Sequence, residues 1–301
     1  MTENENAFLK AYFQDRQKIV EEALLYYLPK EDNIPADIYK AVHYSVFNGG
    51  KRIRPILCLA AAEAVGGDLA PAMPIACALE LIHTYSLIHD DLPSMDDDDF
   101  RRGQPTCHKV FGENIAILAG DALLTEAFVL LSRAEKVRLS AERRLAVVQE
   151  IANAAGICGM VGGQALDVLS EKSEPNENTL REIHRRKTGA IIVAAVKSGA
   201  IIFNAGKDKI QALAEYGINV GLAFQIADDI LNVEGDRELM GKETGSDAAR
   251  NKLTYPSLLG MGKAKEKLAK YIDAAVASLS GFDERAMPLI VIARYIMERK
   301  S

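Results

Sequence analysis

The sequence has no tryptophan, only four cysteines and no long uninterrupted apolar run. The cysteines are widely spaced and form no Cys-x-x-Cys pair, which argues against a zinc site; they are Cys58, Cys77, Cys107 and Cys158. All but Cys107 lie in apolar, helix-like stretches, so we expect buried free thiols of a reducing compartment. The apolar stretch 190–203 is interrupted by Lys197 and Ser198, and we expect no membrane span.

An excess of positive charge is also missing. The 36 lysines and arginines are outnumbered by 42 aspartates and glutamates, which gives a formal net charge of -6. This balance excludes a general nucleic-acid surface, although metals and a local basic cluster could still hold an anion. The first residues, Met-Thr-Glu-Asn-Glu-Asn, are unlike a signal or transit peptide. We therefore expect a soluble, cytoplasmic protein.

No Pro/Ser-rich linker or compositional break divides the chain, and its 49% of apolar residues can form a sizeable core. We therefore predict a single domain over residues 1–301. The alternating, β-branched pattern of strands is missing, whereas helix-forming runs bounded by Pro and Gly recur. These runs predict an all-α bundle of about ten helices, near residues 5–28, 35–49, 55–65, 71–88, 113–131, 138–169, 178–204, 207–233, 254–280 and 284–299.

The densest chemistry lies in residues 83–102. An apolar helical run ends at Asp90 and Asp91, the carboxylates 96–99 follow, and Arg101 and Arg102 come next. Clustered carboxylates repel one another, and hard divalent cations such as Mg²⁺ relieve that repulsion. The arginines offer paired donors for a phosphate. The pattern predicts carboxylates that hold a metal and guanidinium groups that steady a metal-bound phosphate.

A second acidic pair repeats this arrangement. Asp228 and Asp229 again end an apolar stretch, and Asn232 follows four residues after Asp228. Positions i and i+4 share a helix face, so Asp228 and Asn232 could point at one ion. Two such clusters facing each other would hold a polyanion between metals.

Two further patterns need separate interpretations. The run Gly49-Gly50-Lys51-Arg52-Ile53-Arg54-Pro55 places cations in a turn that enters a helix, where free N–H groups attract phosphate, but it is not a P-loop. Glu80-Leu-Ile-His83 is half of a di-iron motif. The other histidines lack Glu three residues earlier, so we exclude a di-iron site.

With these residues in view, the chain resembles the trans-isoprenyl diphosphate synthases from Gly50 to Arg299. The run Asp90-Asp91-Leu92-Pro93-Ser94-Met95-Asp96 is similar to the first aspartate-rich motif of the family, and Asp228-Asp229-Ile230-Leu231-Asn232 to the second. The pattern is most similar to bacterial farnesyl diphosphate synthases. The second motif departs from the family because Asn232 replaces an aspartate, which removes one negative charge.

The resemblance implies the isoprenoid synthase type I fold, with helices around a central apolar cavity, and a homodimer. It implies Mg²⁺, three ions per site with Mn²⁺ as a possible substitute, held by Asp90, Asp91, Asp96, Asp228 and Asp229. For isopentenyl diphosphate it implies binding by Gly50, Lys51, Arg54, His83 and Arg102. For the allylic diphosphate and its cation it implies Arg101, Lys187, Thr188, Gln225, Lys242 and Lys252, with Lys187, Thr188 and Gln225 as catalytic residues.

The product length depends on where the apolar cavity ends. Tyr85 precedes Asp90 by five residues, or about 7.5 Å along a helix, where its ring could block elongation or simply pack in the core. Tyr85 followed by Ser86 resembles the farnesyl pattern, so we predict condensation of isopentenyl diphosphate with dimethylallyl and geranyl diphosphate to C15. A C20 product and a non-catalytic partner subunit remain alternatives. A terpene cyclase would not need the Lys51/Arg54 set.

Overall fold

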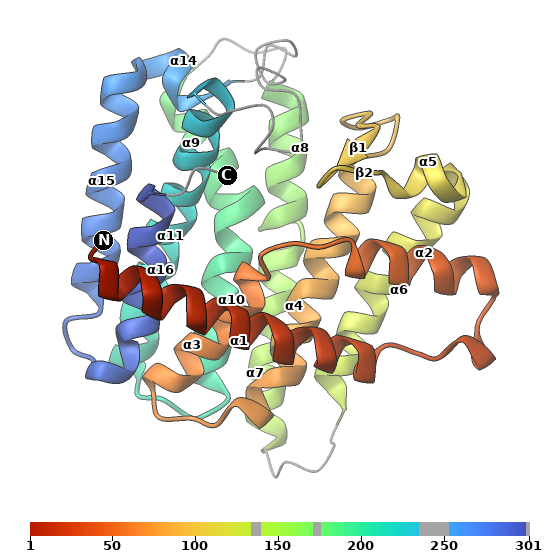
Figure 1. Cartoon of the computed structure of the whole chain (residues 1–301), viewed down its shortest axis with the longest axis horizontal. Helices are drawn as coiled ribbons and strands as arrows, with labels where there is room; N and C mark the ends of the chain where they lie inside the picture. Colours follow the sequence, from red (N-terminus) through yellow and green to blue (C-terminus); the bar gives the residue numbers. More distant parts are fainter. Residues whose placement is uncertain (134–139, 171–175, 235–252, 299–301) are drawn as a thin grey trace.

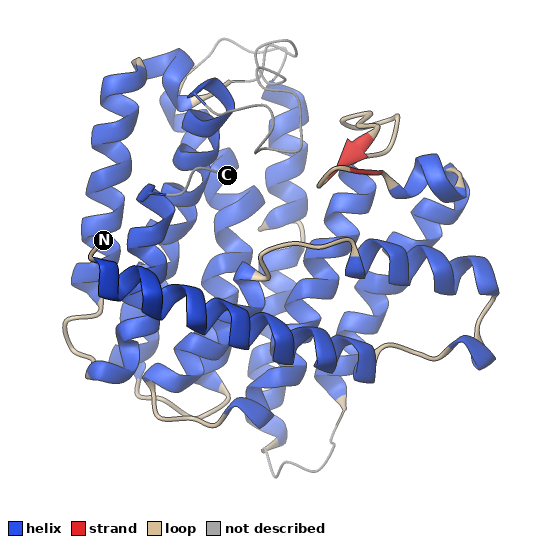
Figure 2. Cartoon of the chain, viewed as in Figure 1, coloured by secondary structure: helices blue, strands red, loops and turns tan. Residues whose placement is uncertain are grey.

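The computed structural model describes residues 1–133, 140–170, 176–234 and 253–298, and these ranges are almost entirely helical (Figure 2). The α-helices are α1 (Glu3–Tyr27), α2 (Ala36–Phe47), α3 (Ile53–Ala64), α4 (Leu69–Asp90), α5 (Cys107–Phe111), α6 (Glu113–Ser132), α7 (Ala141–Ala155), α8 (Met160–Ser170), α9 (Glu177–His184), α10 (Ala190–Ile201), α11 (Lys207–Glu234), α14 (Tyr255–Leu259), α15 (Met261–Ser278) and α16 (Met287–Glu298). Shorter elements are the 3₁₀ turns η1 (Glu31–Asn33) and η3 (Glu284–Ala286) and the π-helix η2 (Arg185–Gly189).

The all-α prediction is confirmed, and the ten predicted helical segments are present, some of them divided. Gly156 ends α7, so the predicted helix 138–169 becomes α7 and α8. Gly260, with φ of 81°, separates α14 from α15. The sequence did not predict the hairpin of β1 (Phe100–Arg101) and β2 (Gln104–Pro105), because its strands are too short to show alternation.

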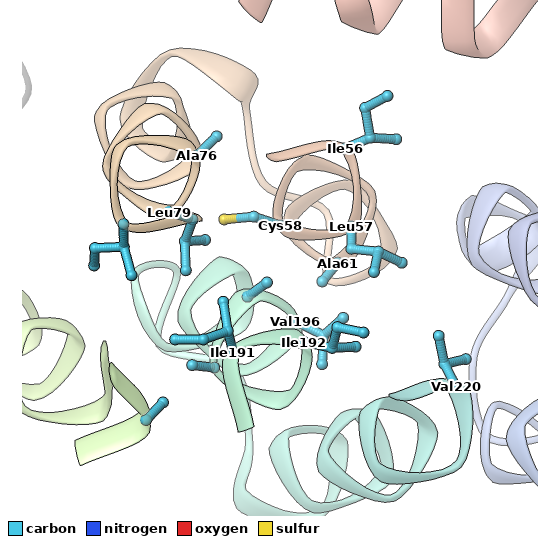
Figure 3. Close-up of a cluster of buried hydrophobic side chains, with 14 of the residues drawn as sticks. Ile56, Leu57, Cys58, Ala61, Ala76, Leu79, Ile191, Ile192, Val196 and Val220 are labelled. Atoms are coloured by element: carbon cyan, nitrogen blue, oxygen red, sulfur yellow. The ribbon is translucent and has the colours of Figure 1, made fainter. Parts of the chain in front are cut away.

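The core lies between α3, α4, α10 and α11 (Figure 3). Cys58 of α3 points toward Leu79 of α4, and Leu57 lies on the opposite side of α3. Both side chains, like Ile192 of α10, are at most 2% exposed. The backbones of α10 and α3 approach each other closely at Gly199 of α10. An ideal Cβ there would lie 2.2 Å from the carbonyl oxygen of Cys58, so only glycine lets these two backbones meet.

The free cysteines confirm the prediction only in part. Cys58 and Cys77 are buried in the core, and burial raises the pKa of Cys58 to about 12. Cys158 was predicted to be buried, but it is exposed. The reason is the break between α7 and α8, which carries residues 156–159 out of the helix.

Three helical stretches are long and apolar enough to cross a membrane by length and composition: Leu69–Asp90, Glu113–Ser132 and Ala141–Ser170. Charged residues interrupt these stretches, for example Asp121 and Glu126 in the second, so the absence of an uninterrupted apolar run did not reveal them. In the first stretch, which is α4, 67% of the apolar window is buried inside the protein. Its apolar side chains are therefore largely accounted for by packing within the bundle.

Figure 1 shows how the bundle positions the candidate site. Helix α1 runs across the front of the long helices, and the β1–β2 hairpin lies at the same end of the bundle as the C-terminal end of α4. Helices α9 and α14 lie at this end as well. The first acidic motif is therefore carried to one end of the bundle, beside the loop that bears Arg101 and Arg102.

Candidate active site

A cavity of about 870 Å³ lies between α4, α8, η2 and α11. Twelve of the residues predicted from the sequence line it: Arg54, His83, Tyr85, Ser86, Asp90, Asp96, Arg101, Arg102, Lys187, Thr188, Gln225 and Asp228. These residues come from segments far apart in the chain. The bundle thus brings both acidic motifs and the basic residues to one space.

Three carboxylates reach this cavity, those of Asp90, Asp96 and Asp228. The chain folds back after α4, so that the Asp96 N–H donates to the Asp90 carbonyl at 2.8 Å. Burial raises the pKa of Asp90 to about 6, the Lys187 ammonium lowers it, and Asp96 raises it again. Burial and the Asp96 carboxylate both disfavour the charged form of Asp90, and a hard cation would offset both effects. Three carboxylates lining one cavity therefore fit a Mg²⁺ site.

The structure places Asp91 and Asp229, also predicted as metal ligands, outside the cavity lining. The Asp91 carboxylate accepts hydrogen bonds from Arg101, with Nε 2.8 Å from Oδ1. The Asp229 carboxylate is buried and accepts from the backbone N–H of Tyr255 at 2.9 Å, which ties α11 to the start of α14. In this arrangement both carboxylates orient neighbouring elements.

Within the described ranges, another group of possible metal ligands lies close together. The ligand atoms of Asp97, Asp99 and His108 are within 4.8 Å of one another. Lys109 already pairs with Asp99 at 2.7 Å, and both aspartates are exposed. We assign this group no role.

The basic end of the cavity contains Arg54, His83 and Arg102. Arg102 donates to the carbonyl of Gly49, and its guanidinium lies so close to Gly50 that an ideal Cβ there would be 2.6 Å from Cζ. Burial lowers the pKa of His83 well below its usual value, and Arg54 and Arg102 lower it further. His83 is therefore a neutral imidazole among cations, which suits hydrogen bonding to an anion.

Lys51 was predicted to bind the same anion, but it does not line the cavity. Its ammonium lies 5.9 Å from the ring centroid of Tyr295 on α16. The structure thus separates it from Arg54, with which the sequence grouped it. Lys242 and Lys252, and also Arg299, lie outside the described residues.

The π-helix η2 presents Lys187 and Thr188 to the cavity. A wider helical turn of this kind is rare and often marks a functional site. The Thr188 hydroxyl donates to Gln225 Oε1 at 2.8 Å, so the remaining oxygen lone pairs form a polar spot in an otherwise apolar wall. Close backbone contacts at two glycines hold the turn: Gly163 lies against the backbone of Lys187, and Gly221 against that of Gly189.

Helix α8 supplies an apolar wall and two polar residues that the sequence analysis missed. The wall consists of Met160, Val161, Ala165, Val168 and Leu169. Gln164 also lines the cavity, and Asp167 pairs with Lys187 at 2.7 Å. The run Gly162-Gly163-Gln164-Ala165-Leu166-Asp167 offered one clue, because paired glycines inside a helical run indicate close packing.

A cavity lined by apolar side chains together with carboxylates and cations is suited to a molecule that has an anionic head and an apolar tail. The comparisons with known proteins agree. The model of the family described as polyprenyl synthetase matches residues 35–286. The chain therefore belongs to the polyprenyl synthetase family, and it is a prenyltransferase that elongates trans-prenyl diphosphates.

Individual relatives span nearly the whole chain. A farnesyl diphosphate synthase of Geobacillus stearothermophilus is 47% identical over 291 residues, 97% of this chain and 98% of that protein. A geranylgeranyl diphosphate synthase of Cyanophora paradoxa is 44% identical, with 98% of both chains covered. The crystal structure of geranylgeranyl pyrophosphate synthetase from Pyrococcus horikoshii superposes with a TM-score of 0.89 at 33% identity, covering 98% of this chain and 99% of that one. The isoprenoid synthase fold is thereby confirmed.

Proposed function

We propose that this enzyme condenses isopentenyl diphosphate with dimethylallyl and then geranyl diphosphate, head to tail, and stops at (E,E)-farnesyl diphosphate. The observation that carries the product length is the position of Tyr85. It lines the cavity on α4, five residues before Asp90, and is only 6% exposed. A ring fixed at this depth limits the length of the apolar chain that the cavity accepts.

Similarity does not decide the product length, because relatives named as farnesyl and as geranylgeranyl synthases have 47% and 44% identity to this chain. The argument therefore rests on the cavity. The ring of Tyr85 meets that of His89 edge to face, with centroids 5.8 Å apart. His89 in turn contacts the Ile117 carbonyl of α6 at 3.1 Å. These contacts restrict the movement that would open the cavity further.

The residues present fit divalent cations. We propose that Asp90, Asp96 and Asp228 hold Mg²⁺, which when bound supplies positive charge to the departing diphosphate. Each of these carboxylates lines the cavity, and burial, together with the neighbouring Asp96, raises the pKa of Asp90, an effect that a bound cation would oppose. We place Asp91 and Asp229 outside this set because each carboxylate has a partner elsewhere.

Other side chains of the cavity would bind the two substrates and stabilise the allylic cation. Arg101 and Lys187 bind the allylic diphosphate and stabilise it as its bond to carbon breaks. Arg54, His83 and Arg102 hold isopentenyl diphosphate at the other end, so that its double bond faces the allylic carbon. The oxygens of Thr188 and Gln225 stabilise the allylic cation. The apolar wall of α8 excludes water, which would otherwise trap that cation.

The test is the product distribution of three proteins supplied with Mg²⁺, isopentenyl diphosphate and dimethylallyl diphosphate. The parent and a Tyr85→Phe variant, which keeps the ring, are expected to give mainly C15. Tyr85→Ala is expected to give C20 or longer chains. C20 from the parent would overturn the proposed product but keep the reaction. A folded parent that gives no condensation product would support a non-catalytic subunit instead.

We further propose a homodimer located in the cytoplasm. Helices α6 and α7 and the turn between α7 and α8 expose large apolar side chains, among them Leu118 at 52%, Leu145 at 67% and Ile157 at 81%. Such side chains are costly in water and are typical of a surface covered by a second copy. Light scattering after size exclusion would measure the mass, and Leu118→Lys is expected to shift it toward one chain. A monomeric parent would contradict the dimer.

A further inference from the structure

Glu80 is a buried carboxylate that the reaction described above does not use. It lies on α4, one turn before His83, and is 1% exposed. Its Oε1 accepts a hydrogen bond from Arg52 Nη1 at 2.7 Å. Among the described residues, Oε2 has no hydrogen-bond partner. Removing a charge from water is costly, so a buried carboxylate with one unpaired oxygen requires a compensating function or environment.

Its partner Arg52 occupies an unusual position. It is the N-cap of α3 and has a φ of 51°, a left-handed conformation that residues other than glycine rarely adopt. Gly49 and Gly50 just before it also have positive φ. Arg52 is 2% exposed, and its guanidinium also donates to the carbonyl of Val46, near the end of α2, at 2.7 Å. One side chain thus joins the end of α2, the start of α3 and the middle of α4.

This junction holds the turn that precedes Arg54, and Arg102 of the β1–β2 hairpin contacts the same turn. Arg54 stands two residues after Arg52, and Arg102 donates to Gly49. Burial lowers the pKa of both Arg54 and Arg102, and in each case Glu80 opposes that effect. Glu80 is therefore a buried negative charge that acts on both cations at this end of the cavity, with smaller contributions from Asp228 on Arg54 and Asp91 on Arg102.

We propose that Glu80 is a positioning residue for the isopentenyl diphosphate site, acting through Arg52 and through the charge it sets against Arg54 and Arg102. The inference rests on the proposed function, which assigns this end of the cavity to isopentenyl diphosphate. Glu80 does not touch the substrate. It fixes the strained turn and keeps the arginines clustered before the anion arrives.

A merely structural ion pair would behave differently. Replacing a buried pair by apolar residues of similar volume is often neutral for stability, whereas removing one partner is strongly destabilising. A structural pair would therefore change the melting temperature without separating the two substrates. If the pair positions the substrate site, loss of its charges would weaken isopentenyl diphosphate binding even in a stable protein.

The experiment measures KM for each substrate, together with kcat and Tm, in four variants of the full chain. Glu80→Gln removes the charge at nearly constant shape. The double variant Arg52→Met/Glu80→Leu removes the pair and refills the space. Arg54→Gln reports on the assigned subsite itself. Glu63→Gln is the matched control, because Glu63 lies on α3 and pairs with Arg16 of α1.

Glu80→Gln and the double variant are expected to raise KM for isopentenyl diphosphate about tenfold, with KM for the allylic diphosphate changed less than about twofold. Glu63→Gln is expected to lower only Tm. A double variant with the parent KM for isopentenyl diphosphate would overturn the inference, even if Glu80→Gln does not fold. If Arg54→Gln leaves that KM unchanged, the subsite assignment fails instead, so the two failures are distinguishable.

Discussion

Lys187 and Asp167 form an ion pair at the edge of the cavity, with Nζ 2.7 Å from Oδ2. Burial alone would lower the pKa of the Lys187 ammonium, but Asp167 and Asp90 outweigh it and raise that pKa. The pair joins η2 to α8. Lys187 is thus held charged and in place before a diphosphate arrives.

We predict that Asp167→Asn weakens binding of the allylic diphosphate. The amide can still accept a hydrogen bond, but it cannot hold the ammonium by charge, so Lys187 loses its fixed position. Because charge-assisted hydrogen bonds contribute about 1.5–3 kcal/mol, KM for the allylic substrate should rise about tenfold or more. Steady-state kinetics with each substrate varied would measure this.

An exposed carboxylate provides the control for this variant. Asp208→Asn removes a charge at an exposed position near the start of α11, well before Gln225, which lines the cavity farther along the same helix. This variant should leave both KM values unchanged. If Asp167→Asn also leaves the allylic KM unchanged, Lys187 is positioned by η2 alone and the pair has no role in binding.

His184 gives the protein a defined acid sensitivity. It is 7% exposed, and burial lowers its pKa from 6.5 to about 4. Between these two pH values the unfolded chain binds a proton that the folded protein excludes. The free energy of unfolding should therefore fall as the pH is lowered from about 6.5 toward 4, by up to about 3 kcal/mol from this group.

Urea unfolding of the parent and of His184→Gln across this pH range would measure the effect. Asp90 acts in the opposite sense, because its raised pKa means that the folded protein binds its proton first as the pH falls. The difference between variant and parent at each pH isolates His184. We expect the variant to lose less stability on acidification, and parallel curves would contradict the prediction.

Replacing glycine by alanine should change the free energy of unfolding in opposite directions in two helices. At Gly199 an ideal Cβ would lie 2.2 Å from the Cys58 carbonyl oxygen, so Gly199→Ala must separate α10 from α3. We expect a loss of about 2–4 kcal/mol. At Gly262 of α15 nothing lies within 4 Å, and Gly262→Ala should gain about 0.5–1 kcal/mol from helix propensity. Chemical denaturation would measure both changes in the free energy of unfolding. If the two changes have the same sign, backbone contact at Gly199 does not limit how closely α10 packs on α3.

The sequence was sufficient to predict the helices and the identity of most cavity residues, because periodicity and charge clusters are local properties. It did not show which member of each aspartate pair faces the cavity. Asp90 lines it, whereas Asp91 accepts from Arg101, and this difference depends on where the chain folds after α4. Consecutive residues on a helix point about 100° apart, so the two aspartates of a pair face different surroundings. Only the tertiary structure shows which of them faces the cavity.

Residues whose importance comes from distant partners were harder to find. Asp167 is an ordinary acidic residue in its own helix and becomes notable only beside Lys187, 20 residues later. Arg52 was noted only as one of three cations in the turn before α3 and was given no role, yet it is buried against Glu80, 28 residues away. Lys51 points toward Tyr295 of the last helix. No local pattern encodes these contacts.

His89 should influence product length through Tyr85. Its ring packs edge to face on that of Tyr85 at 80°, and because a carbonyl can only accept, Nε2 donates to Ile117. Gly120 of α6 provides the space, since an ideal Cβ there would lie 2.1 Å from Nε2. An aromatic contact of this kind contributes about 0.5–1.5 kcal/mol, enough to change the ratio between two positions of the Tyr85 ring by up to about tenfold.

We predict that His89→Ala yields a larger fraction of C20 product than the parent, whereas His89→Phe, which keeps the ring contact, yields less C20 than His89→Ala. Chromatography of the dephosphorylated products would measure the fractions. The same distribution from parent and His89→Ala would mean that the packing of α4 alone holds Tyr85.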